Sequence, residues 1–153
     1  MPGYWVMRTD SRNATPFLWK ELKNGRLRQG WGYDATQNLE LIRAALQKGE
    51  GLTDLQASCW RGNRRLLSSE RDGIREKDII IVPHLPKYGV WSIVRVVGPY
   101  RYEIPDTTGD HGHVVPVTHR QTPGQSVRTS RISPLTADHA EPTSPVEHQW
   151  PRR

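Results

Sequence analysis

The spacing of hydrophobic residues changes near Asp78, and this change constrains the fold of the 153-residue chain more than any other feature. Before this point apolar residues recur at the spacing of helices, and after it they form continuous runs that are typical of buried strands. Residues 79–82 and residues 90–97 are therefore predicted to be two buried strands. Gly98-Pro99 predicts a turn into residues 100–104, which alternate as a half-exposed hairpin partner does.

Two further strands are expected at the ends of this pattern. Residues 4–9 are β-prone and apolar except at their end, so they predict a first strand. Residues 113–117 predict a last strand, in which Pro116 favours a sheet edge or a bulge because proline has no N–H to donate. The sequence thus indicates an α+β domain, with a small, strongly curved mixed sheet or barrel and short helices inserted after the first strand.

Three short helices are predicted between the first strand and the later ones. The first begins at Thr15, with Pro16 in the first helical position, and ends at Asn24-Gly25. The second begins at Asp34 and the third at Thr53, each with a glutamine three residues later in the spacing of a capping box. The predicted buried stripe of the second helix is Leu39, Ile42 and Leu46.

The stretch Gly30-Trp31-Gly32-Tyr33-Asp34 places two large aromatic residues between glycines. Glycine weakens both helices and strands, so this loop is not explained by regular backbone pairing. Its aromatic side chains either close an edge of the core or face a ligand. The sequence leaves both alternatives open.

Composition favours an anionic partner. The net charge is +6, and the chain has six tryptophans against one phenylalanine. Tryptophan, tyrosine and arginine stack on bases and contact phosphates, so nucleic acid is the first candidate. The single cysteine, Cys59, excludes an internal disulfide. With no signal peptide and no apolar run long enough for a membrane span, a soluble cytoplasmic protein is expected.

The chain is expected to divide near residue 120. Residues 1–119 are predicted to form the domain, and residues 120–153 a proline-rich tail or linker that is poorly ordered. In this tail the apolar pattern stops and prolines are spread among Ser, Thr, Gln and His. Such a composition lacks the apolar side chains that offset the entropy of ordering, and it also suits a connection to a further domain.

Several segments resemble the PUA-like superfamily, and within it the EVE domains and the related YTH domains. Tyr4-Trp5-Val6-Met7-Arg8 is similar to the opening strand of EVE domains, and Trp31-Gly32 with Asn38-Leu39 is similar to their tryptophan–glycine loop and following helix. Residues 78–84 resemble the family's Gly-Asp, apolar strand and Tyr-His segment, and residues 89–97 resemble its next strand. The chain departs from the family pattern at Asp34, Lys77 and Pro83.

This resemblance implies a PUA-like binding module whose pocket takes a flipped or unpaired modified base, methylated DNA first and RNA as an alternative. It also implies the specificity part of a modification-dependent restriction or antiviral defence system, with a fused or partner nuclease or NTPase. The module itself is expected to be no enzyme and to need no cofactor or metal. A flipped base loses a few kcal/mol of stacking, and aromatic side chains replace about 1–3 kcal/mol per base.

Aromatic residues are the candidates for the base pocket, and arginines are the candidates for phosphate contacts. The predicted base-pocket residues are Trp5, Trp31, Tyr33, Trp60, His84 and Trp91. The predicted phosphate-binding residues are Arg8, Arg26, Arg28, Arg61, Arg64 and Arg65. For Trp5 and Trp91, which lie on predicted strands, core packing is the favoured alternative. For His84 the alternative is a strand-end histidine bonded to the backbone, and the arginines otherwise only solubilise the chain.

Two functions of other classes remain open. Asp110-His111-Gly112-His113 with His119 contains residue types that hold zinc or a catalytic divalent ion, so the runner-up is a metal-dependent nuclease. The other is a domain that binds protein partners through exposed aromatic residues.

Overall fold

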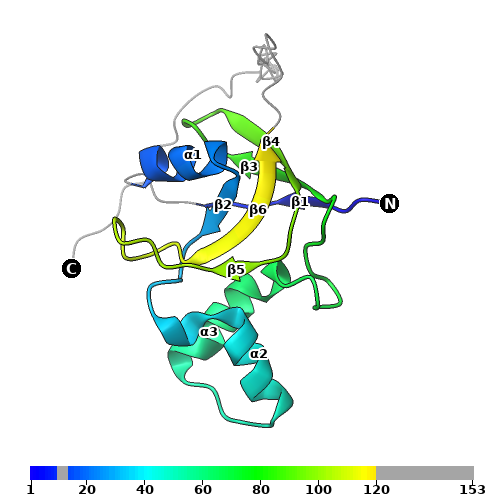
Figure 1. Cartoon of the computed structure of the whole chain (residues 1–153), viewed down its shortest axis with the longest axis vertical. Coiled ribbons are helices and arrows are strands. Elements are labelled where there is room, and N and C mark those ends of the chain that lie inside the picture. Colours follow the sequence, from blue (N-terminus) through cyan, green and yellow to red (C-terminus); the bar gives the residue numbers. More distant parts are fainter. Residues whose placement is uncertain (10–13, 120–153) are drawn as a thin grey trace, which may run out of the picture. The chain divides into compact units, whose positions relative to one another are not determined.

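The computed structural model describes residues 1–9 and 14–119. These residues form a mixed six-stranded sheet with a few short helices, so the prediction of an α+β domain is confirmed (Figure 1). The strands are β1 (Tyr4–Val6), β2 (Arg26–Gln29), β3 (Ile79–Pro83), β4 (Trp91–Val96), β5 (Arg101–Tyr102) and β6 (His113–His119). The helices are α1 (Thr15–Lys23), α2 (Leu39–Gln47) and α3 (Asp54–Asn63), with the 3-10 turns η1 (Ala35–Gln37) and η2 (Arg64–Leu66). The predicted tail, residues 120–153, lies outside the described residues.

The sheet is open and is not closed into a barrel. Its strand order is β1-β3-β4-β6-β2, and β5 pairs with β6 off this path. Only β1 and β3 pair in parallel, and the other described pairs are antiparallel. A parallel pair needs a long crossover connection, and here the crossover contains all three α-helices and β2.

Asp78, the residue before β3, holds the first strand in place. Its buried carboxylate accepts hydrogen bonds from the backbone N–H of Gly3 (2.6 Å), from Nε1 of Trp5 (2.8 Å) and from the backbone N–H of Arg75 (2.9 Å). Burial raises the pKa of this carboxyl, but the hydrogen bonds outweigh that effect and the pKa is lowered. An ionised Asp78 thus fixes the half-buried ring of Trp5 against the core.

Strand β6 has neighbours on both sides, so of the two positions expected for Pro116, a sheet edge or a bulge, the edge is wrong. Its first half lies between β2 and β5, and its second half pairs with β4. The N–H of Val117 donates to Gly25 on the β2 side, so the missing N–H of Pro116 would point to the opposite side. There the neighbour changes from β5 to β4, and a break in the ladder accommodates the proline.

Strand β2 is not predicted by the sequence, since three of its four residues are polar. Glu21 of α1 makes the strand possible, because its carboxylate accepts hydrogen bonds from Arg26 (2.6 and 2.7 Å) and Arg28 (2.6 Å). The hydrogen bond from Arg26 lowers the pKa of Glu21 most, burial opposes the shift, and the result is about 2. The expected hairpin at residues 100–104 is also corrected, since β5 pairs with β6 and not with β4.

The two predicted capping boxes are confirmed, although the first caps a different element. Asp34 and Gln37 cap the short turn η1, and a new N-cap at Asn38 starts α2. The box at Thr53 starts α3, which continues to Asn63. None of the described helices has the length and apolar character that crossing a membrane requires.

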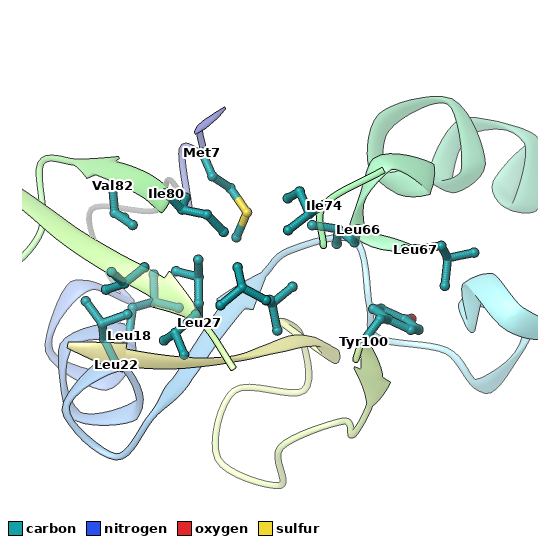
Figure 2. Close-up of a cluster of buried hydrophobic side chains, with 14 of the residues drawn as sticks. Met7, Leu18, Leu22, Leu27, Leu66, Leu67, Ile74, Ile80, Val82 and Tyr100 are labelled. Atoms are coloured by element: carbon teal, nitrogen blue, oxygen red, sulfur yellow. The ribbon is translucent and has the colours of Figure 1, made fainter. Parts of the chain in front are cut away.

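At β3 and β4 the core lies on one face of the sheet and the opposite face is partly exposed, whereas His113, Val114 and Val115 of β6 are all buried. In β4, Ser92 and Val94 are buried while Trp91 and Ile93 are exposed, so the prediction of fully buried strands is only half right. The buried face packs against α1 and against residues near η2, as Figure 2 shows for Leu18, Leu22, Leu66 and Ile74. The buried stripe of α2 contains Leu39 and Ile42 but not Leu46, which is 41% exposed.

Candidate nucleic-acid interface

The Trp31 loop connects β2 to η1 and presents its aromatic ring outward. Trp31 has φ of 65°, in the left-handed region that a residue with a side chain rarely adopts. Holding such a conformation costs about 1–3 kcal/mol, and it persists only where the surroundings enforce it. Trp31 is 54% exposed, so burial of its ring offsets only part of this cost.

A partly buried hydrogen bond to the backbone of Trp31 stabilises this conformation. His113, which is fully buried in β6, places Nε2 2.9 Å from the carbonyl oxygen of Trp31 and Nδ1 2.8 Å from the hydroxyl of Tyr100. The carbonyl can only accept, so Nε2 carries the proton and Nδ1 accepts from Tyr100. Burial lowers the pKa of His113 to about 4, and the ring is neutral at physiological pH.

Close backbone packing holds the other half of the loop. The N–H of Gly32 donates to Asp110 (3.0 Å), and the N–H of Gly112 donates to the carbonyl oxygen of Gly32 (2.9 Å). A Cβ on Gly32 would lie 2.6 Å from the backbone nitrogen of Gly112, which is closer than real contacts allow. Glycine at position 32 is therefore required by the approach of two backbone segments.

The ring of Trp31 lies against helix α3 at Gly62. A Cβ on Gly62 would lie 3.4 Å from the ring, so the indole packs closely against the helix at this glycine. Tyr33, two residues on, is 51% exposed, and Arg61 next to Gly62 is exposed and makes no ion pair with any described residue. Trp60 instead packs against the core and is only half exposed. The ring of Trp31 thus lies beside helix α3 at Gly62, the residue that follows Arg61 in the sequence.

The other predicted arginines are mostly engaged with carboxylates. Arg64 and Arg65 both contact Asp72, at 2.7 and 2.9 Å. Arg28 is buried and also donates to the carbonyl oxygens of Glu103 (2.7 Å) and His111 (3.1 Å). These contacts direct the guanidinium groups towards other parts of the chain, and among the predicted phosphate contacts Arg61 and Arg8 make no ion pair with a described residue.

Arg8 and His84 line a separate cleft of about 740 Å³ that does not include the Trp31 loop. The cleft lies between the first turns of α1 and the connection from β3 to β4. Its lining residues are Arg8, Thr9, Thr15, Pro16, Leu18, Trp19, Pro83, His84, Leu85, Pro86, Lys87 and Tyr88. Trp19, Lys87 and Tyr88 were not among the predicted site residues, although Lys87 and Tyr88 place a basic and an aromatic residue in the loop between two predicted strands.

Trp5 and Trp91 take different positions from both groups. Trp5 is half buried and its Nε1 donates to Asp78, as described above. Trp91 is 62% exposed on the outer face of the sheet, where Tyr4, Val6 and Ile93 are exposed as well. The six predicted base-pocket residues are therefore distributed over several places, and only Trp31 and Tyr33 share one exposed loop.

The histidines of the nuclease alternative are not brought together. His113 and His119 are the two ends of β6, a separation of roughly 20 Å at about 3.3 Å per residue. Across residues 1–9 and 14–119, no group of three or more His, Cys, Asp or Glu side chains could hold a metal ion. Cys59 is buried and its pKa is raised to about 11 by burial, which keeps it a thiol at neutral pH.

Comparison with known proteins adds no relative. The chain matches no protein-family model, no curated protein and no solved structure. The resemblance to PUA-like domains thus stays a prediction made from the residues themselves.

Proposed function

We propose that the chain is a PUA-like nucleic-acid-binding module that recognises a modified base in DNA, with the base stacked on Trp31. The observation that carries this proposal is the exposed indole of Trp31 on a residue in the left-handed region, whose backbone carbonyl oxygen is bonded to the buried His113. A strained residue that the surroundings over-determine is characteristic of ligand contacts.

The energies support a flipped base as the ligand. A base that leaves the duplex loses a few kcal/mol of stacking, and an aromatic platform returns about 1–3 kcal/mol. Trp31 needs no rearrangement to offer its face, because the loop beneath it is already fixed by His113 and by Gly112. Tyr33 on the same loop offers a second aromatic side chain close by.

Phosphate contacts would come from helix α3. Arg61 precedes Gly62, against which the indole packs. The guanidinium of Arg61 has no ion-pair partner among the described residues. With a net charge of +6, the chain attracts polyanions over a longer range. We expect Arg61→Ala to reduce the slope of log affinity against log salt by about 1, since one phosphate contact is lost.

A methyl group on the base would add a modest preference by itself. Burying one methyl-sized group contributes about 0.8 kcal/mol, which corresponds to roughly fourfold in affinity. In this proposal the module is the specificity part of a restriction or defence system, and cleavage belongs to a fused or partner enzyme.

Binding to matched methylated and unmethylated oligonucleotides, single-stranded and duplex, tests the proposal. Trp31→Ala should weaken binding by about 1–3 kcal/mol and reduce the preference for the modified base. Trp91→Ala is the matched control, because Trp91 is similarly exposed but lies on the outer face of the sheet. Equal affinity for all oligonucleotides would remove modified-base recognition, and an effect of Trp91→Ala alone would move the site to the sheet.

The outer face of the sheet is also the feature that favours the alternative of a protein-interaction domain. It exposes Tyr4, Val6, Trp91 and Ile93. Absence of nucleic-acid binding by the wild-type chain, together with a protein contact that Ile93→Lys abolishes, would favour this alternative.

A further inference from the structure

The cleft beside α1 has the size and position of a second binding site. Its volume of about 740 Å³ falls within the range of roughly 300–1,000 Å³ that small-ligand sites occupy. One wall is the start of α1, and the other is the connection between β3 and β4. The cleft is distant from the Trp31 loop, because Trp19 contacts His119 at the end of β6 whereas Trp31 is held by His113 at its beginning.

An aromatic pair forms the wall that the β3–β4 connection contributes. The rings of His84 and Tyr88 are stacked, with centroids 4.5 Å apart and planes only 3° from parallel. His84 has φ of 62°, and its Nδ1 accepts a hydrogen bond from the N–H of Gly89 (3.2 Å). Tyr88 is 86% exposed although His84 covers one of its faces, so its remaining face is open to a planar ligand.

The opposite wall supplies a third ring. Trp19 of α1 lines the cleft, and His119 contacts it edge-on at 5.3 Å between centroids. The ammonium of Lys23 lies 5.6 Å from the centre of the same ring. These neighbours limit the orientations of the indole, so the wall is in place before a ligand arrives.

The charge of the cleft is positive. Arg8 and Lys87 line it, and no lining residue in the described part of the chain is acidic. Neither side chain makes an ion pair with a described residue. The first turn of α1 adds to this field, because Thr15 and Pro16 lie at the positive end of the helix dipole.

From these observations we infer that the cleft binds a nucleotide, with its base against the His84–Tyr88 pair and its phosphate near Arg8 and Lys87. Flat walls select a planar group, and two cations without an ion-pair partner among the described residues favour an anion attached to it. A nucleotide joins both features within one small ligand. The same chemistry is offered by a free mononucleotide and by a nucleotide of a bound DNA strand.

Titration of the full chain separates these two sources. One arm uses a free nucleoside monophosphate and the matching nucleoside without phosphate, followed by calorimetry. The other arm uses a short single-stranded oligonucleotide. If free nucleotides are the ligand, the monophosphate should bind about tenfold more tightly than the nucleoside, since charge-assisted hydrogen bonds are lost with the phosphate. If the strand is the ligand, only the oligonucleotide should respond to changes in the cleft.

Two variants assign the binding to the cleft. Lys87→Ala should weaken binding of the responding ligand about tenfold, and Tyr88→Ala should weaken it at least about fivefold. Both side chains are exposed, so folding is expected to persist and circular dichroism checks it. Trp31→Ala should leave binding of the free monophosphate unchanged, so in that arm this site and the proposed base platform fail independently. The inference is overturned if neither ligand binds, or if Lys87→Ala and Tyr88→Ala bind as the wild type does.

Discussion

Trp31 and His84 each carry an exposed aromatic ring on a residue in the left-handed region, with φ of 65° and 62°. Their loops, the Trp31 loop and the connection from β3 to β4 (the His84 loop), are supported by different contacts. Trp31 rests on a buried hydrogen-bond network in which His113 is central. His84 is supported at the surface, by the N–H of Gly89 and by stacking on Tyr88. The comparison teaches that an exposed ring can be coupled strongly or weakly to the stability of the fold, and that exposure alone does not distinguish the two cases.

The sharpest test of this difference is to remove the buried support. His113→Ala should lower the free energy of unfolding by about 4 kcal/mol, because a buried side chain is lost and the partners Trp31 and Tyr100 are left without it. Denaturant titration measures the change. A loss below about 1 kcal/mol would mean that the Trp31 loop does not depend on His113.

A pH titration examines the same support without a mutation. The pKa of His113 is about 4 in the folded chain and near 6.5 when unfolded, so the unfolded state binds more protons between these values. Stability should therefore fall as the pH drops from about 6.5 to 4, by on the order of 3 kcal/mol from this group. Burial also lowers the pKa of His119, which adds a loss of the same sign.

The control for this profile is His113→Gln, which has no proton to gain in that range. It should flatten much of the fall above pH 4. Glu21 contributes little to this slope. Its pKa falls from 4.5 in the unfolded chain to about 2 in the folded chain, so the stability that it contributes is lost only as the pH falls below about 4.5. An unchanged slope in His113→Gln would assign the titration to another group.

Disturbing the close packing of the Gly32 backbone against Gly112 should lower the free energy of unfolding by a smaller amount. Gly32→Ala places a Cβ 2.6 Å from the nitrogen of Gly112, and we expect a destabilisation of about 1–3 kcal/mol from the forced shift. Gly51→Ala is the matched control, since nothing lies within 4 Å of a Cβ there. Thermal unfolding of both variants checks the prediction, and similar melting temperatures would contradict it.

The smallest effect is expected at the other loop. Tyr88→Ala should change the free energy of unfolding by less than about 0.5 kcal/mol, because the side chain is 86% exposed and makes its ring contact with His84 alone among the described residues. Denaturant titration next to His113→Ala gives the contrast directly. A large loss at Tyr88 would remove the distinction between the two loops.

Much of the local structure was predictable from residues close together in the sequence. The capping boxes at Asp34 and Thr53 are present, although the first serves η1 and not α2. Strand β2 was not predictable in this way, because Arg26 and Arg28 become acceptable in a strand only through Glu21 on another element. The position of Pro116 was misjudged for the same reason, since its neighbours β4 and β5 approach from distant parts of the chain.

For the candidate site, too, local features could be predicted from the sequence and tertiary contacts could not. That Trp31 lies in a glycine-flanked loop, and that His84 follows a strand, can be read from the sequence. Three contacts cannot be read from the sequence, because each joins residues far apart in the chain. His113 bonds to the carbonyl oxygen of Trp31, and Gly62 lies against its ring. Arg8 and Tyr88 line the same cleft.

The sequence by itself determined the α+β class, the starts of α1 and α3 and the positive charge, because these follow from composition and from interactions over three or four residues. Only the tertiary structure decided which aromatic rings are exposed to solvent and which arginines have no ion-pair partner among the described residues. Burial and ion pairing depend on the partners that the fold places beside each side chain, and for Trp31 and Arg28 those partners come from other elements of the fold.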